Sequence, residues 1–352
     1  MPQYILAFLF AFLITYLLTP LVKKMAIRTG AVDIPDSADE GRRIHIRPTP
    51  RLGGLAIYLG FMLPALTLLP REGERLYGLL LGATLILLLG IADDYRNLSP
   101  RVKLAGQVLA ALVFIFMGNR VIWLSNPWAE GAHDAMWHIG SWSIPLTLLW
   151  MVGITNTLNL IDGLDGLAAG VTAIASVTLL LVALQEGQVT IVLLTAALAG
   201  STLGFLPYNF NPAQIFMGDT GSLFLGFVLA GIAVQGALKS ATVIALAVPI
   251  LALGLPILDT FLAIVRRYHN GSPIFQADRQ HLHHRLLERG LSQRQAVLFL
   301  YSISGVFGMG ALAITEVRGR FGLFALAFAV LAFFLNLRRL KQFDIRGKNL
   351  KG

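Results

Sequence analysis

Acidic residues at the ends of long apolar segments are the groups in this sequence best placed to do chemistry. They are five aspartates in three groups: Asp93 with Asp94, Asp162 with Asp165, and Asp219. A charged carboxylate is costly inside a bilayer, so acids gathered at one membrane interface indicate a bound cation or a polar substrate. The sequence therefore predicts an integral membrane enzyme.

The first group ends an expected helix, after the apolar run LILLLGIA. Successive helical side chains point about 100° apart, so Asp93 and Asp94 can face one pocket. Acids are unfavourable where the helix dipole is negative, which argues for a compensating cation or a functional demand. A solvated helix end with a charged turn is the alternative interpretation.

The second group belongs to a segment in which a polar side chain recurs at every third position. Its members are Asn156, Asn159, Asp162 and Asp165. Neighbouring members share a helix face, and amides with acids can bond a base or a ribose through both donors and acceptors. Ordinary turn chemistry of Asn, Asp and Gly is the alternative, although a simple turn does not need four polar residues in register.

The third group is the motif from Phe216 to Ser222, FMGDTGS, which precedes an apolar segment. A helix that starts here presents an N-terminus that favours phosphate. Asp219 is well placed to hold Mg²⁺ while the ion contacts phosphate oxygens. Helix capping by Asp219 and Thr220 is the structural alternative.

One polar loop combines three histidines with two arginines: Arg279, His281, His283, His284 and Arg285. On a helix, His281, His284 and Arg285 would share one face and form a cationic surface for a diphosphate. Zinc is a weaker interpretation, because adjacent arginines disfavour a zinc site and the chain has no cysteine. A basic loop that binds lipid headgroups is the third interpretation.

Two further groups have two interpretations each. Arg47 and Arg51, in the first polar loop, can guide an anionic substrate or reflect only the charge bias of inner loops. Asp259, near the end of another apolar segment, can contact a substrate or pair with Arg266 and Arg267.

The elements that would position these groups are membrane-spanning helices. Hydrophobic residues make up 56% of the chain and charged residues 13%, and several apolar runs approach the roughly 20 residues that cross a bilayer. We expect an all-α polytopic membrane protein, a single domain over 1–352 with about eleven spans. The spans are 4–22, 53–70, 77–92, 102–118, 143–157, 166–184, 189–206, 221–236, 241–264, 296–315 and 321–337.

The distribution of basic residues predicts the orientation. Cytoplasmic loops of membrane proteins are enriched in Lys and Arg, and 22 of the 28 lie in or beside alternate loops of this chain. The net charge of +9 therefore indicates topology and attraction to anionic headgroups of membrane lipids, and it does not indicate nucleic-acid binding. The expected inner loops and basic tail are 23–52, 93–101, 158–165, 207–220, 265–295 and 338–352.

Taken together, these motifs resemble those of one family, the polyprenyl-phosphate N-acetylhexosamine-1-phosphate transferases of glycosyltransferase family 4. The match in order and spacing rests on ADD at 92–94, NxxNxIDGLDGLA at 156–168, FMGDTGSL at 216–223 and DRQHLHHRL at 278–286. The family includes phospho-N-acetylmuramoyl-pentapeptide transferase. The DRQHLHHRL form and the eleventh span resemble more closely the branch that uses a simple UDP-N-acetylhexosamine.

The resemblance implies a reaction at the cytoplasmic face of the plasma membrane. The phosphate of undecaprenyl phosphate, or another polyprenyl phosphate, would attack the β-phosphorus of UDP-N-acetylglucosamine or a related UDP-sugar. UMP would be released, and the lipid product would start a cell-envelope glycan such as lipopolysaccharide or teichoic acid. A homodimer is compatible with the resemblance.

The resemblance also implies roles for the residues. Asp219 would bind Mg²⁺, with Mn²⁺ as the alternative ion, and Asp93 and Asp94 would assist the metal or the acceptor phosphate. The three histidines would hold the diphosphate. The residues near the nucleotide would be Asn159, Asp162, Asp165 and Phe216. Direct attack by the lipid phosphate is favoured over a covalent intermediate, because much of a phosphate monoester is already dianionic at neutral pH.

Two other functional classes are alternatives. A transporter would place its intramembrane acids near the bilayer midplane at a repeat interface, whereas these acids border inner loops and no repeat is evident. A membrane zinc hydrolase is the second alternative. The exact sugar, the lipid length and the downstream polymer do not follow from the sequence.

Overall fold

The computed structural model describes residues 2–34, 48–69, 73–125, 136–239, 247–269 and 281–316. Its long elements are all helices, which confirms the expected all-α class. The expected span 321–337, the tail 338–352 and the candidate site residues Arg47 and Arg279 lie outside the described residues.

Twelve helices and two short hairpins make up the described part of the chain. The helices are α1 Gln3–Thr29, α2 Gly53–Leu68, α3 Gly73–Arg96, α4 Pro100–Phe116, α5 Ser143–Ile161, α6 Leu167–Gln185, α7 Val189–Asn209, α8 Gly218–Lys239, α9 Ala247–Ala252, α10 Gly254–His269, α11 Leu282–Glu288 and α12 Gln293–Glu316. The strands are β1 Val32–Asp33, β2 Thr49–Pro50, β3 Trp123–Ser125 and β4 Met136–His138, and a 3₁₀ turn covers Gly140–Trp142.

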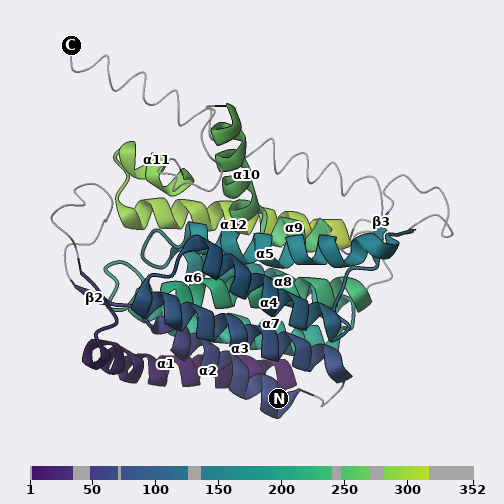
Figure 1. Ribbon diagram of the computed structural model, residues 1–352, viewed down its shortest axis with the longest axis horizontal. Coiled ribbons are helices and arrows are strands. Elements are labelled where there is room, and N and C mark those ends of the chain that lie inside the picture. Colours follow the sequence, from purple (N-terminus) through teal and green to yellow (C-terminus); the bar gives the residue numbers. More distant parts are fainter. Residues whose placement is uncertain are drawn as a thin grey trace.

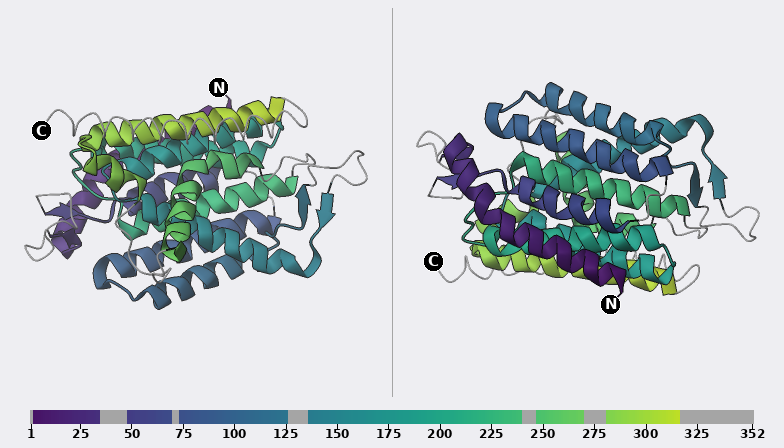
Figure 2. Two further views of the ribbon diagram at one scale, coloured as in Figure 1. Left: turned by 90° about the horizontal axis from the view of Figure 1, so that it is seen from above. Right: turned by 90° about the horizontal axis from the view of Figure 1, so that it is seen from below.

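Seven helices of the described residues are long and apolar enough to cross a membrane, and α2 is a shorter apolar helix. The chain is therefore a multi-pass membrane protein. Most of the long helices run side by side along the longest axis of the molecule (Figures 1 and 2). The antiparallel pairs β1–β2 and β3–β4 lie at opposite ends of this bundle.

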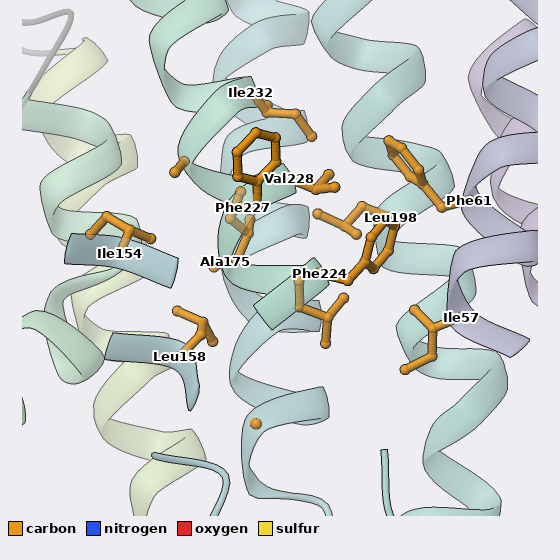
Figure 3. Close-up of a cluster of buried hydrophobic side chains, with 14 of the residues drawn as sticks. Ile57, Phe61, Ile154, Leu158, Ala175, Leu198, Phe224, Phe227, Val228 and Ile232 are labelled. Carbon is orange, nitrogen blue, oxygen red and sulfur yellow. The ribbon is translucent and has the colours of Figure 1, made fainter. Parts of the chain in front are cut away.

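Helix α8 occupies the centre of the bundle, because it is apolar on all sides and can be buried all round. It packs against α2, α3, α5, α6 and α7. Its Phe224, Phe227 and Val228 meet Phe61 of α2 and Ile154 of α5 in the core shown in Figure 3. Helix α8 is thereby held in place by five neighbouring helices.

Helix α1 packs at the edge of the bundle against α7 and α2. Small side chains repeat every four residues on its buried face, at Ala7, Ala11, Thr15 and Thr19. Such a stripe lets helix backbones approach closely in a membrane, where dispersion contacts drive helix association. The opposite face carries exposed leucines that suit contact with lipid.

The expected single span 241–264 differs from the structure, which has α9 and α10 with a break at Leu253. Pro256 lacks an N–H for the carbonyl of Ala252 and its ring crowds that carbonyl, which favours a break. Gly254 lies so close to the ring of Phe307 that an added Cβ would be 2.7 Å from it. Helix α10 consequently leaves the direction of the bundle and stands across the other helices (Figure 1).

Candidate active site

A pocket of about 320 Å³ lies at the β1–β2 end of the bundle. It brings together residues from all three aspartate groups, from the first polar loop and from the histidine loop. The residues that line it are Asp33, Arg51, Asp94, Asn159, Asp162, Gly163, Leu164, Asp165, Asn209, Phe216, Gly218, Asp219, His284 and Gln293. Motifs spread over more than 200 residues of sequence thus converge on one site, as their common placement at helix ends predicts.

The carboxylate of Asp94 caps the N-terminus of α8 from a neighbouring helix. Its oxygens accept hydrogen bonds from the backbone N–H of Asp219 at 3.0 Å and of Thr220 at 3.1 Å, and from the Thr220 hydroxyl at 2.6 Å. Gly218 has φ of +68°, and a Cβ there would lie 2.3 Å from Asp94 Oδ2. The anion site that we expected a phosphate to use at this helix start is therefore filled by Asp94.

Lys103 of α4 is a cation beside the pocket that the sequence interpretation missed. Its ammonium group lies 3.1 Å from Asp93 Oδ2 and forms an ion pair with Asp219. Asp93 also accepts the N–H of Leu98 at 2.8 Å, which fixes the turn after α3. A single lysine at the start of an apolar segment follows the usual charge bias of inner loops, so it does not stand out as a site residue. Its position three residues after Pro100 is the one feature that could have drawn attention to it.

The two asparagines of α5 have different partners. The amide of Asn159 donates to Asp219 Oδ1 at 3.1 Å and to Ser222 Oγ at 2.8 Å, so it orients the Asp219 carboxylate. Asn156, one turn earlier, exchanges hydrogen bonds with Gln107 of α4 at 2.5 Å and 3.3 Å. Asn156 thus joins α4 to α5 below the pocket, whereas the sequence predicted a substrate contact for it.

The turn between α5 and α6 carries Asp162 and Asp165. Burial raises the pKa of Asp162 to about 8, and the negative charges of Asp219, Asp94 and Asp165 add to this shift. Asp165 Oδ2 accepts the Asn211 amide at 3.0 Å and the N–H of Ala213 at 2.9 Å. Asp162 is therefore held in the protonated form near neutral pH, while Asp165 fixes the loop between α7 and α8.

The first polar loop joins the site through backbone pairing. Arg51 forms an isolated parallel bridge with Phe216, and the N–H of Phe216 donates to Pro50 O at 2.8 Å. The Arg51 guanidinium donates to the backbone O of Asp94 at 2.9 Å and to Asn97 Oδ1 at 3.2 Å. Arg51 and Phe216 thus lie at the pocket as expected, and Arg51 also ties the loop to the end of α3.

The histidine loop does not form the single cationic surface that we expected. His281 is buried and lies 3.0 Å from Asp259 through its Nδ1, and Arg285 is exposed and does not line the pocket. Burial, with the nearby charge of His284, lowers the pKa of His283 to about 3. Among the described residues of this loop, only His284 lines the pocket, because His281 and His283 are buried in the protein interior.

Some residues line the pocket without a clear signal in the sequence, among them Asp33 and Gln293. Asp33 comes from β1 and Gln293 from the first turn of α12. Gln293 also accepts a hydrogen bond from Asn211 at 2.5 Å, which links α12 to the loop before α8. An acid in a short strand and a glutamine at a helix start are common surface features, so only the fold identifies them.

The acid set has the chemistry of a Mg²⁺ site shared with a substrate. Within the described ranges, no three His, Asp or Glu side chains form a ready metal cage. Mg²⁺ is usually bound by one or two carboxylates together with phosphate oxygens and water. Asp219 fits this pattern, because its carboxylate lines the pocket and is held in place by Asn159. The described residues therefore fit an ion that binds together with a phosphorylated substrate.

Comparisons with known proteins give matches over most of the chain. The sequence profile described as Glycosyl transferase family 4 matches residues 76–237. The chain is 42% identical over 314 residues to the probable undecaprenyl-phosphate N-acetylglucosaminyl 1-phosphate transferase of Bacillus subtilis, covering 89% of this chain and 86% of that protein. It is 40% identical to the decaprenyl-phosphate N-acetylglucosaminephosphotransferase of Mycolicibacterium smegmatis, over 82% of this chain and 77% of that protein. It is also 35% identical to the phospho-N-acetylmuramoyl-pentapeptide-transferase of Moorella thermoacetica, over 79% of this chain and 88% of that protein.

Proposed function

Because these matches show that the chain belongs to glycosyl transferase family 4, we propose that it transfers N-acetylglucosamine 1-phosphate from UDP-N-acetylglucosamine to undecaprenyl phosphate. UMP is the second product, and the lipid-linked sugar diphosphate starts a cell-envelope glycan. The observation that carries the proposal is the pocket itself, in which Asp219, Asn159 and His284 meet at one end of a membrane bundle.

The charge of the pocket supports a reaction between polyanions that needs a cation. Five aspartates line the pocket, and its basic side chains are Arg51 and His284. Two phosphorylated substrates would meet strong repulsion there unless a divalent cation offset it. Mg²⁺ held by Asp219 would supply positive charge to the diphosphate.

The chain's own residues would hold the reacting groups in place. Asn159 orients the Asp219 carboxylate, and Asp94 fixes the helix that carries it. The Lys103 ammonium pairs with Asp93 and Asp219, so it fixes the Asp219 carboxylate and offsets part of the negative charge of these acids. Fixing both substrates in this way lowers the entropic cost of bringing them together.

The bond changes follow from the substrates. A phosphate oxygen of the lipid attacks the β-phosphorus, the bond from this phosphorus to the bridging oxygen breaks, and UMP leaves with that oxygen and the electron pair. The acceptor phosphate has a second pKa near 6, so a large share is dianionic at neutral pH and needs little help from a base. Direct attack therefore needs no covalent intermediate on Asp93 or Asp94.

The choice of sugar and the side of the membrane belong to the same proposal. The names of the two relatives at 40% and 42% identity specify N-acetylglucosamine phosphate transfer. The pocket lies at the end of the bundle where α1, α3 and α4 carry Lys23, Lys24, Arg28, Arg96, Arg101 and Lys103. This charge bias supports a cytoplasmic location for the pocket end, because cytoplasmic loops are enriched in Lys and Arg.

The test is a competition between nucleotides in one reaction. Purified protein is incubated with undecaprenyl phosphate, Mg²⁺ and equal concentrations of UDP-N-acetylglucosamine and UDP-N-acetylmuramoyl-pentapeptide, and the lipid products are separated by mass. We expect the N-acetylglucosamine lipid to dominate and UMP to appear in equal amount. A dominant muramoyl-pentapeptide lipid would reject the sugar, and the absence of any lipid product would reject the reaction.

A further inference from the structure

We propose that Asp259 is a positioning residue for the transfer, which rests on the function proposed above. It holds the start of α11 and, through His281, sets the place of His284 in the pocket. Asp259 belongs to α10, the helix that leaves the bundle, and it does not line the pocket. Its effect on the reaction would therefore be indirect.

Both oxygens of Asp259 are engaged with the start of α11. Oδ1 accepts the backbone N–H of Leu282 at 2.9 Å, and Oδ2 lies 3.0 Å from His281 Nδ1. A carboxylate can only accept at this distance, so His281 donates its Nδ1 proton. His281 itself makes no side-chain cap for α11, so Asp259 provides the cap from another helix.

Asp259 and His281 are both buried, so their relative position is closely constrained. Asp259 is 8% exposed and His281 is 4% exposed. A buried carboxylate is costly unless it is paired and hydrogen bonded, so neither partner can move away without loss of stability. The N-terminus of α11 is thus tied to α10 at a defined position.

A row of histidine rings leads from this pair to the pocket. The rings of His281 and His283 are parallel with centroids 5.8 Å apart, and the rings of His283 and His284 are 4.2 Å apart. The His283 ring also packs on Gly163, where an added Cβ would lie 2.5 Å from its Nε2. A shift of His281 would therefore displace His283 against the turn that carries Asp162, and would move His284.

Helix α11 depends on this anchor because it is only seven residues long. So short a helix is marginal without tertiary contacts. It packs against α12, its His283 ring rests on Gly163, and the Asp259 side chain holds its start. Asp259 therefore determines where α11 begins, while α12 supports its apolar face.

The test compares Asp259→Ala, His281→Ala and the double variant in the purified full-length protein. We expect each single change to raise the KM for UDP-N-acetylglucosamine. We also expect each to lower kcat/KM by about 10²-fold, as displacement of a positioned group by about 1 Å can do. The double variant should lose no more than the worse single variant, because both changes break the same link. Glu74→Gln, which removes an exposed carboxylate at the opposite end of α3, is the control and should keep wild-type kinetics.

Asp259→Asn separates positioning from folding. The amide oxygen can still accept from Leu282, and the amide NH₂ can donate to His281 in its other tautomer. We expect the KM of this variant for UDP-N-acetylglucosamine to be much closer to the wild-type value than the KM of Asp259→Ala. A purely structural role would reduce the amount of folded enzyme and leave the KM unchanged, and that result, or additive losses in the double variant, would overturn the proposal. Absence of turnover by the wild-type protein with either nucleotide would reject the proposed function, and with it the positioning role.

Discussion

Adjacent carboxylates in this site have different partners. Asp93 binds Lys103 and the turn after α3, whereas Asp94 caps α8. The helical rotation of about 100° between neighbouring residues explains how two acids can serve two elements. Asp219 lies between these two systems, because its backbone N–H contacts Asp94 while its side chain contacts Lys103.

Replacing Asp219 by Asn tests its role in metal binding. The amide keeps the size of the side chain and can still accept the Asn159 hydrogen bond, but it removes the charge. We expect the turnover rate to fall by at least roughly 10²–10³, comparable with loss of a strong electrostatic contributor, while the protein stays folded. UMP release measured over a range of Mg²⁺ concentrations checks this, and near-normal turnover at ordinary Mg²⁺ would contradict the assignment.

The raised pKa of Asp162 predicts how stability changes with pH. Its pKa of about 8 in the folded protein exceeds the ordinary value of 3.8, so the folded state binds the proton more tightly than the unfolded state. The resulting stability is fully present below about pH 4 and is lost as pH rises through about 8. We expect Tm of the metal-free protein in detergent to fall between pH 6 and pH 9.

Asp162→Asn is the matched variant for that measurement, because Asn resembles the protonated acid at every pH. Its Tm should depend less on pH than the wild-type Tm over the same range, since the other titratable groups are shared by both proteins. Equal slopes would show that Asp162 does not titrate in this window.

Much of the site could be predicted at the residue scale, and the exceptions have a common cause. The pocket is lined by five of the predicted residues, Asp94, Asn159, Asp162, Asp165 and Asp219. They could be predicted because acidic side chains beside membrane-spanning segments are costly and usually serve a function. Lys103 was missed, and Asn156 and His283 do not line the pocket. Their positions depend on which helix packs against which, and a single sequence without pairing information does not reveal that.

At the scale of elements, close contact between α3 and α8 decides the position of Asp219. Gly90 of α3 lies against the first turn of α8, where a Cβ would be 2.5 Å from the Thr220 Cα and 2.6 Å from the Asp219 backbone O. The backbone of α8 would have to move to make room, and Asp219 would move with it. The contact therefore has no spare space for even one methyl group.

Gly90→Ala should accordingly lower both Tm and turnover. We expect a stability loss of about 1–3 kcal/mol, as for overpacking of a core, and a loss of activity from the displaced Asp219. Gly153→Ala in α5 is the control, because nothing lies within 4 Å of its added Cβ. Alanine favours helix over glycine by about 1 kcal/mol, so this control should be neutral or stabilising. Wild-type activity in Gly90→Ala would show that the helices can separate without cost.

The elements also show what hydropathy can and cannot predict. The first eight expected spans each match one described helix, from α1 to α8, because long apolar runs leave few alternatives in a bilayer. The break at Leu253 was not predicted, although Pro256 and Gly254 are visible in the sequence. A hydropathy window averages over a break, and α10 shows that the second half of the run leaves the bundle.

At the scale of the whole molecule, the pocket lies at one end of the bundle and the β3–β4 hairpin lies at the other. Positive charges at the pocket end predict that this end faces the cytoplasm. A UDP-sugar donor also requires the pocket to face one particular side, because a nucleotide sugar can reach the site only from the compartment that contains it. The orientation and the proposed substrate therefore have to agree.

Cysteine labelling in intact cells tests the orientation, and the chain has no cysteine of its own to interfere. Ser99→Cys and Glu288→Cys place a thiol at exposed positions near the pocket end, and Ser141→Cys places one at an exposed position near β4. We expect an impermeant thiol reagent to label position 141 in intact cells, and positions 99 and 288 only after the membrane is permeabilised. Serine to cysteine changes one atom, so these two variants should keep wild-type activity. Labelling of position 99 but not of position 288 from outside would place the acids and the histidine loop on different sides of the membrane, and no single site could then contain both.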